Sequence, residues 1–192
     1  EFLLEHAFVT LANDENIRVR QALDLCTGSG VIAVVLAKEL AHVDVIAGDC
    51  SLKALAVARE NISRHNLNGR IQLLCADLLT CFRPTVRFDL IVTNPPYVKA
   101  DDLSGLQPEV RDWEPELALS GGRSGMERIE VICRDAMQYL RPGGWLFMEI
   151  GADIAEAVKL AFLCERRWYD QVRVLKDWAG RPRVLQARRR QD

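Results

Sequence analysis

The sequence has 192 residues, of which 49% are hydrophobic and 27% charged, as in an ordinary soluble globular protein. Its formal net charge of −2 argues against a general nucleic-acid-binding surface. No apolar stretch reaches membrane-spanning length without a charge or a turn residue, and the first residues lack the pattern of a signal peptide. We therefore expect one cytoplasmic domain without membrane contact.

The six cysteines are scattered through apolar segments. They form no C-x-x-C pair and no Cys/His cluster at the spacing of metal ligands. The sequence thus predicts buried, reduced thiols and no metal site.

Strand and helix patterns alternate along the chain. After an apolar helical stripe near the start, strand patterns occur at residues 22–25, 43–47, 71–75, 88–93, 145–150, 172–175 and 183–187. Helical patterns occur at 31–40, 51–65, 126–140 and 154–166, with Ser51 as an N-cap. This order predicts an α/β fold with a seven-stranded, mostly parallel sheet. The last two strands are close enough to pair as an antiparallel hairpin.

Residues 98–123 form a long connection rich in Asp, Glu, Pro and Gly. Connections of this length without a clear helix or strand pattern are more often functional than idle. We expect this segment to act as a lid.

The tetrapeptide Asn94-Pro95-Pro96-Tyr97 directly follows the strand pattern at 88–93. The carboxyl ends of strands are where α/β sheets bind ligands. Asn94 offers a donor and an acceptor, and the two prolines remove backbone donors, so neighbouring carbonyls stay free to accept. Tyr97 adds a flat face for stacking. Residues 94–97 thus form a polar cup that suits a planar NH2 group in an amide or a base. The alternative is that the tetrapeptide is a turn that merely ends the strand.

Small and acidic residues follow the first three strands. Gly28 and Gly30 let the backbone approach a ligand at the start of the next helix. Asp49 ends the second strand, a placement that lets a carboxylate accept both hydroxyls of a ribose. Asp77 ends the third strand, where it could accept from an adenine amine while Leu78 covers the ring. Together they predict an adenosine slot, although each alone could serve as a turn former.

The glycine loop by itself leaves two cofactors open. The run Gly28-Ser29-Gly30-Val31-Ile32-Ala33 also matches the dinucleotide fingerprint G-x-G-x-x-A. A dehydrogenase needs a hydride site and usually a catalytic side chain after the fourth strand, whereas the tetrapeptide there supplies acceptors for an amine. Methyl transfer from S-adenosylmethionine fits better, with an NAD-binding oxidoreductase domain and a non-catalytic cofactor-binding module as alternatives.

The segments 24–30 (Asp-Leu-Cys-Thr-Gly-Ser-Gly) and 94–97, with Asp49 and Asp77, together resemble the class I S-adenosylmethionine-dependent methyltransferases that act on planar nitrogens. Within these, the chain resembles the release factor glutamine methyltransferases (HemK family). The closer match rests on Asn94 to Val98, Glu114-Pro115, Ala118-Leu119, Gly121-Gly122, Gly125-Met126 and Pro142-Gly143-Gly144. It covers essentially the whole chain.

The resemblance implies a Rossmann-like methyltransferase fold and S-adenosyl-L-methionine as cofactor, with S-adenosyl-L-homocysteine as product. The methyl group would go to the glutamine side-chain amide in the Gly-Gly-Gln motif of a peptide chain release factor, with no direct nucleic-acid partner. The cofactor residues would be Asp24, Cys26, Thr27, Gly28, Ser29, Gly30, Asp49, Cys50, Asp77, Leu78 and Asn94. The substrate would meet Asn94, Pro95, Pro96 and Tyr97, with the Asn94 Oδ1 and the Pro95 carbonyl as amide acceptors and Tyr97 as a stacking wall.

Two departures accompany the resemblance. Cys26 stands where the family usually has glycine. The family also has an upstream helical domain, so residues 1–192 are expected to be the methyltransferase domain alone, able to bind cofactor but weaker in release-factor recognition. Adenine-N6 DNA or RNA methyltransferases carry a similar cup and remain the alternative, against which the acidic 98–123 segment argues.

Overall fold

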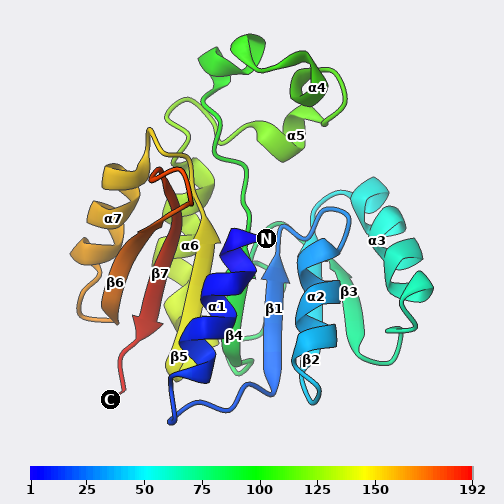
Figure 1. Cartoon of the computed structure of the whole chain (residues 1–192), viewed down its shortest axis with the longest axis vertical. Coiled ribbons are helices and arrows are strands. Elements are labelled where there is room, and N and C mark those ends of the chain that lie inside the picture. Colours follow the sequence, from blue (N-terminus) through cyan, green and yellow to red (C-terminus); the bar gives the residue numbers. More distant parts are fainter. Residues whose placement is uncertain (192) are drawn as a thin grey trace.

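The computed structural model describes residues 1–191 and contains a seven-stranded sheet in the order β3-β2-β1-β4-β5-β7-β6 (Figure 1). The strands are β1 (Gln21–Leu25), β2 (Asp44–Asp49), β3 (Ile71–Cys75), β4 (Phe88–Thr93), β5 (Leu140–Glu149), β6 (Tyr169–Lys176) and β7 (Pro182–Arg189). β1 to β5 are parallel, and β7 lies antiparallel between β5 and β6. The predicted α/β sheet and its antiparallel terminal hairpin are confirmed.

Helices cover both faces of the sheet (Figure 1). One face carries α1 (Phe2–Ala12), α2 (Val31–Glu39) and α3 (Leu52–Arg64), whose apolar sides pack with Val45, Leu90 and Phe147. The other carries α6 (Glu127–Tyr139) and α7 (Ala155–Cys164), which pack with Leu23 and Ile91. Strand side chains alternate between these two cores because successive residues of a strand point to opposite faces. The sheet is therefore buried on both sides, as parallel sheets require.

The strand register aligns the carboxyl ends that carry the predicted site. Leu25 at the end of β1 pairs with Gly48 of β2 and with Thr93 of β4. Asp49 pairs with Cys75, and Thr93 pairs with Met148 of β5. The residues that follow these strands therefore share one edge of the sheet.

The structure corrects the predicted course of two segments. β5 begins at Leu140 rather than at residue 145, and residues 141–144 interrupt its pairing with β4, because Phe88 pairs with Leu140 while Leu90 already pairs with Trp145. The 98–123 connection contains three short helices: η1 (Ala100–Gly105), α4 (Pro108–Arg111) and α5 (Glu116–Leu119).

The expectation of buried thiols is mostly wrong. All six cysteines are free, but only Cys133 is buried, and Cys50, Cys75, Cys81 and Cys164 are exposed. The apolar segments that contain these four end at the surface, so a neighbouring apolar run is a poor guide to the burial of a terminal residue. Within residues 1–191, the helices are too short or too polar to cross a bilayer.

Candidate active site

A cavity of about 580 Å³ opens at the carboxyl edge of the sheet. This is within the range of about 300–1,000 Å³ usual for small-molecule sites. The predicted residues on its lining are Cys26, Thr27, Gly28, Ser29, Asp49, Cys50, Asp77, Leu78, Asn94 and Pro96. Four other predicted residues, Asp24, Gly30, Pro95 and Tyr97, lie behind this lining or beside it.

Asp24 lies beneath the loop between β1 and α2. Its side chain is fully buried, and its Oδ2 accepts hydrogen bonds from the Thr27 hydroxyl and from the Ala33 amide at 2.9 Å. Burial is the main reason why the pKa of Asp24 is raised to about 7. The carboxylate therefore ties the loop to the first turn of α2 and shapes the cavity from behind.

The two glycines of this loop differ in their surroundings. Gly28 has a φ of +56°, and a Cβ atom added there would meet nothing within 4 Å, so its backbone faces open space. Gly30 has a φ of +81°, and a Cβ there would lie 3.0 Å from the Cβ of Ala58 in α3. Gly28 thus exposes its backbone to the cavity, whereas Gly30 permits close packing of α2 on α3.

Asp49 is held by backbone amides on both sides of its carboxylate. Its Oδ2 accepts from the Gly28 N–H at 2.9 Å, and its Oδ1 accepts from the Ser51 N–H at 2.8 Å. Each carboxylate oxygen has a further lone pair. The side chain is therefore oriented at the cavity wall and keeps acceptor capacity for a hydroxyl group.

Asp77 has a partner that sequence reasoning missed. The Nη1 of Arg128, at the start of α6, lies 3.0 Å and 3.3 Å from the two carboxylate oxygens of Asp77, and both residues line the cavity. No sequence signal marked Arg128, because the pairing joins residues 51 positions apart.

Two lining residues have strained backbones. Cys26 and Leu78 have φ values of 60° and 50°, in the left-handed region that side-chain-bearing residues rarely adopt. Such strain gathers at ligand sites more often than elsewhere. Cys26 thus occupies a conformation that suits the glycine expected at this position.

The tetrapeptide 94–97 is fixed at both ends. The Thr93 hydroxyl donates to the Leu25 carbonyl at 2.7 Å, which joins the end of β4 to β1. Asn94 is exposed, and Pro95 is buried. A Cβ at Gly121 would lie 2.7 Å from the Tyr97 Cα, and one at Gly125 would lie 2.5 Å from the Tyr97 carbonyl oxygen. Glycine at these two positions allows the chain at and just after the end of the 98–123 segment to pack directly on Tyr97.

Tyr97 is turned toward β5. Its hydroxyl lies 3.4 Å from the Oε1 of Glu149, the last residue of β5, and the pKa of Tyr97 is raised, first by burial and then by the Glu149 charge. Glu149 itself lines the cavity. Sequence reasoning missed Glu149, although it follows the rule that identified Asp49: it is an acidic residue at the carboxyl end of a parallel strand.

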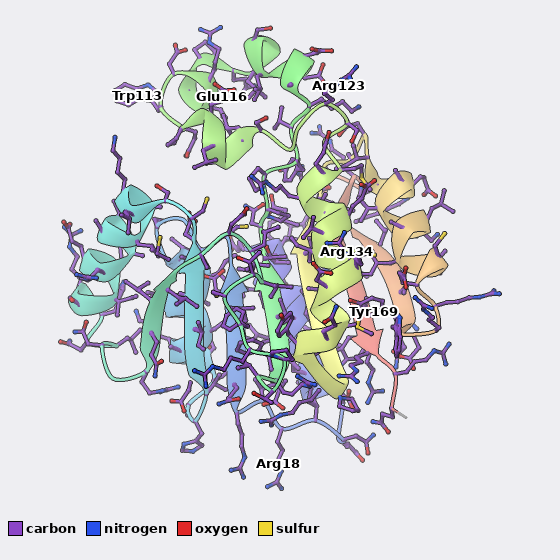
Figure 2. The ribbon with its side chains drawn as sticks, turned by 180° about the vertical axis from the view of Figure 1, so that it is seen from behind. Arg18, Trp113, Glu116, Arg123, Arg134 and Tyr169 are labelled. Carbon is purple, nitrogen blue, oxygen red and sulfur yellow. The ribbon has the colours of Figure 1, made fainter. Side chains whose placement is uncertain are left out.

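The 98–123 segment stands above the carboxyl edge of the sheet, as Figure 2 shows for the part near Trp113 and Glu116. Its base is closed by hydrogen bonds from the Val98 N–H to Leu119 and from the Gly121 N–H to Val98. The short helices η1, α4 and α5 contain no buried residue, and Trp113 is 85% exposed. The cavity lining includes Val110, Glu114, Pro115, Leu117, Ala118 and Leu119 of this segment.

Comparison with known proteins agrees with this architecture. The chain is similar to a release factor glutamine methyltransferase of Cereibacter sphaeroides, with 46% identity over 166 residues that cover 86% of this chain and 58% of the relative. It is also similar to a protein of the same name from Clostridium botulinum, with 34% identity and coverage of 98% and 65%. The chain thus spans less than two thirds of the length of these relatives.

A methyltransferase from Pyrococcus furiosus shares the fold, with a TM-score of 0.67, 19% identity and coverage of 97% of this chain and 82% of that one. The sequence model of the methyltransferase small domain matches residues 2–106, which include the β1 loop, Asp49, Asp77 and the 94–97 cup. The chain belongs to the methyltransferase small domain family.

Proposed function

We propose that this chain transfers a methyl group from S-adenosylmethionine to the glutamine side-chain amide in the Gly-Gly-Gln motif of a peptide chain release factor. The observation that supports this most is the exposed Asn94 side chain, next to Pro96, in the same cavity as Gly28 and Asp49. The relatives named release factor glutamine methyltransferase support the choice of substrate.

The cavity fits the cofactor in its chemistry. Gly28 leaves room for a ligand beside its backbone, and the oriented Asp49 carboxylate retains acceptor capacity for ribose hydroxyls. Asp77 and Leu78 offer an acceptor and an apolar surface for a base. The cofactor supplies a methyl group already activated on a sulfonium, so the protein's task is to position the acceptor nitrogen.

A primary amide is a weak nucleophile because its nitrogen lone pair is conjugated with the carbonyl group. The Asn94 Oδ1 and the Pro95 carbonyl are the proposed acceptors for the two N–H groups of the substrate, and they would aim the nitrogen at the methyl group. Holding the reacting atoms in line lowers the entropic part of the barrier. Fixed acceptors also stabilise the positive charge that develops on the nitrogen, which gives up one N–H proton to solvent as the cofactor leaves as S-adenosylhomocysteine.

The proposal can be tested by following a radiolabelled methyl group. The chain and labelled cofactor would be incubated with a release factor, with the same release factor carrying alanine in place of the motif glutamine, or with adenine-containing DNA and RNA. We expect label only in the unaltered release factor. Label in a nucleic acid would favour the adenine methyltransferase alternative, and equal label in both release factors would contradict glutamine as the acceptor.

A further inference from the structure

The arrangement of Tyr97 differs from that of a free stacking wall. Its ring is half-buried, and a Cβ added at Gly151 would lie 3.1 Å from its Cδ2, so one edge of the ring packs on the backbone after β5. Its hydroxyl points to Glu149 at 3.4 Å. Among the described residues, those that line the cavity include Glu149 but not Tyr97.

We propose that Glu149 is a positioning residue that holds the Tyr97 hydroxyl and thereby fixes the two proposed acceptors, the Asn94 Oδ1 and the Pro95 carbonyl, at the cavity. This inference rests on the proposed function and deepens it, because it assigns a role to a carboxylate that the comparisons do not address. Tyr97 then acts through its hydroxyl group, which joins the 94–97 tetrapeptide to the end of β5. We call this contact the latch.

The contacts around Tyr97 favour this positioning role. Gly121 and Gly125 enclose the backbone of Tyr97 on one side, and Gly151 borders its ring on the other. These contacts hold the backbone of the residue on one side and one edge of its ring on the other. The hydrogen bond to Glu149 joins that ring to the fifth strand, which packs beside β4 through Thr93 and Met148.

The 3.4 Å separation is longer than the 2.7–2.8 Å typical of O–H···O hydrogen bonds. Hydrogen bonds of catalytic sites are often long without substrate and shorten in the reactive complex. The charges around the Tyr97 hydroxyl act in opposite directions: the Glu149 carboxylate raises the pKa of Tyr97, and the Arg183 guanidinium lowers it. Replacement of the carboxylate by an amide would keep an acceptor oxygen while it removes the charge.

The test compares Tyr97→Phe, Glu149→Ala, Glu149→Gln and the double variant Tyr97→Phe/Glu149→Ala, with Glu60→Gln on α3 as a surface control. We expect Tyr97→Phe and Glu149→Ala each to lower kcat about tenfold, the usual scale of one lost hydrogen bond. The double variant should lose no more than either single variant, because both remove the same contact. Glu149→Gln should keep most of kcat, and calorimetry should show unchanged affinity for S-adenosylhomocysteine.

A second readout is independent of activity. Ultraviolet titration, with the Tyr97→Phe signal subtracted, reports the ionisation of Tyr97 alone. We expect Glu149→Gln to lower the pKa of Tyr97, because the neighbouring negative charge is gone. A general loss of folding would instead lower the pKa of the buried Tyr169 as well, which Glu149→Gln should leave unchanged.

Three results would contradict the positioning role of Glu149. Full kcat in Tyr97→Phe would show that the hydroxyl group is not needed. Additive losses in the double variant would show that the two side chains act independently. A kcat of Glu149→Gln as low as that of Glu149→Ala would show that the negative charge is needed. If the unaltered chain failed to label a release factor, the proposed function would be wrong instead. The two failures are thus distinguishable.

Discussion

The Oδ2 of Asp49 accepts a hydrogen bond from the backbone N–H of Gly28 at 2.9 Å, which joins the end of β2 to the glycine loop after β1. One carboxylate therefore orients the loop on one side of the cavity and offers acceptors to a ligand on the other. Loss of this side chain would affect both functions at once.

We expect Asp49→Ala to weaken binding of S-adenosylhomocysteine by about 1.5–3 kcal/mol, the scale of hydrogen bonds to a charged group. This corresponds to roughly a 10- to 150-fold rise in the dissociation constant. Isothermal titration calorimetry would measure it, with Asp44→Ala at the opposite end of β2 as a matched control. Equal affinities of the two variants would remove Asp49 from the cofactor site.

Asn94→Ala should abolish methyl transfer and leave cofactor affinity nearly intact, because the Asn94 Oδ1 is assigned to the substrate amide, whereas the adenosine contacts are assigned to Asp49, Asp77 and Leu78. We expect kcat to fall about 100-fold or more, as for other positioning groups. Single-turnover kinetics and calorimetry on the same preparation would separate the two effects. Normal turnover by this variant would refute the amide-holding role.

The buried Asp24 predicts a dependence of stability on pH. Its pKa rises from 3.8 in the unfolded chain to about 7 in the folded chain, so the folded state retains a proton that the unfolded state releases between these values. The contribution of Asp24 to the free energy of unfolding should therefore fall as pH rises from about 4 to about 7, and level off above that.

Asp24→Asn should remove this contribution, because asparagine does not titrate. Urea unfolding across the same pH window would show a flatter profile for Asp24→Asn than for the unaltered chain, with the exposed Asp44→Asn as a control. The comparison cancels the other carboxylates, whose pKa shifts are common to both proteins. Parallel profiles would show that Asp24 does not titrate in this range.

The 98–123 segment should contribute to recognition of a protein substrate. Three of its charged residues are already paired: Lys99 with Asp153, and Arg111 with Asp112. Carboxylates of its exposed face include Asp102 and Glu109, which suit a partner with cationic side chains around its glutamine.

We expect the double variant Asp102→Asn/Glu109→Gln to lower kcat/KM for the release factor at low salt, with kcat unchanged. The difference should shrink as ionic strength rises, because salt screens exposed charges. The double variant Glu60→Gln/Glu156→Gln, on α3 and α7, gives the same change in net charge elsewhere. Equal losses in both double variants would show that only net charge matters.

Much of the architecture could be predicted from the sequence, because apolar runs, glycines and helix caps are local signals. All seven strands were placed, and the Ser51 N-cap is confirmed by its hydrogen bond from the Ala54 N–H at 3.2 Å. The irregularity before Trp145 could not be predicted, because it depends on the register with β4. The exposed cysteines were missed because burial depends on which elements pack over the end of a strand or helix or over a turn.

The candidate site was predicted in part for the same reason. Residues at strand ends can be found from the strand pattern, and that rule placed Asp49, Asp77 and Asn94 on one cavity. Arg128 required knowledge of how α6 packs, and the contact of Tyr97 with Glu149 joins residues 52 positions apart. Such long-range contacts have no local sequence signal.

The most direct test of the central claim is tandem mass spectrometry of the Gly-Gly-Gln peptide from a release factor treated with this chain and S-adenosylmethionine. We predict a gain of one methylene mass, placed by fragmentation on the glutamine side chain and absent when Asn94→Ala replaces the unaltered chain. An unmodified peptide, or a methyl group on another residue, would contradict the claim.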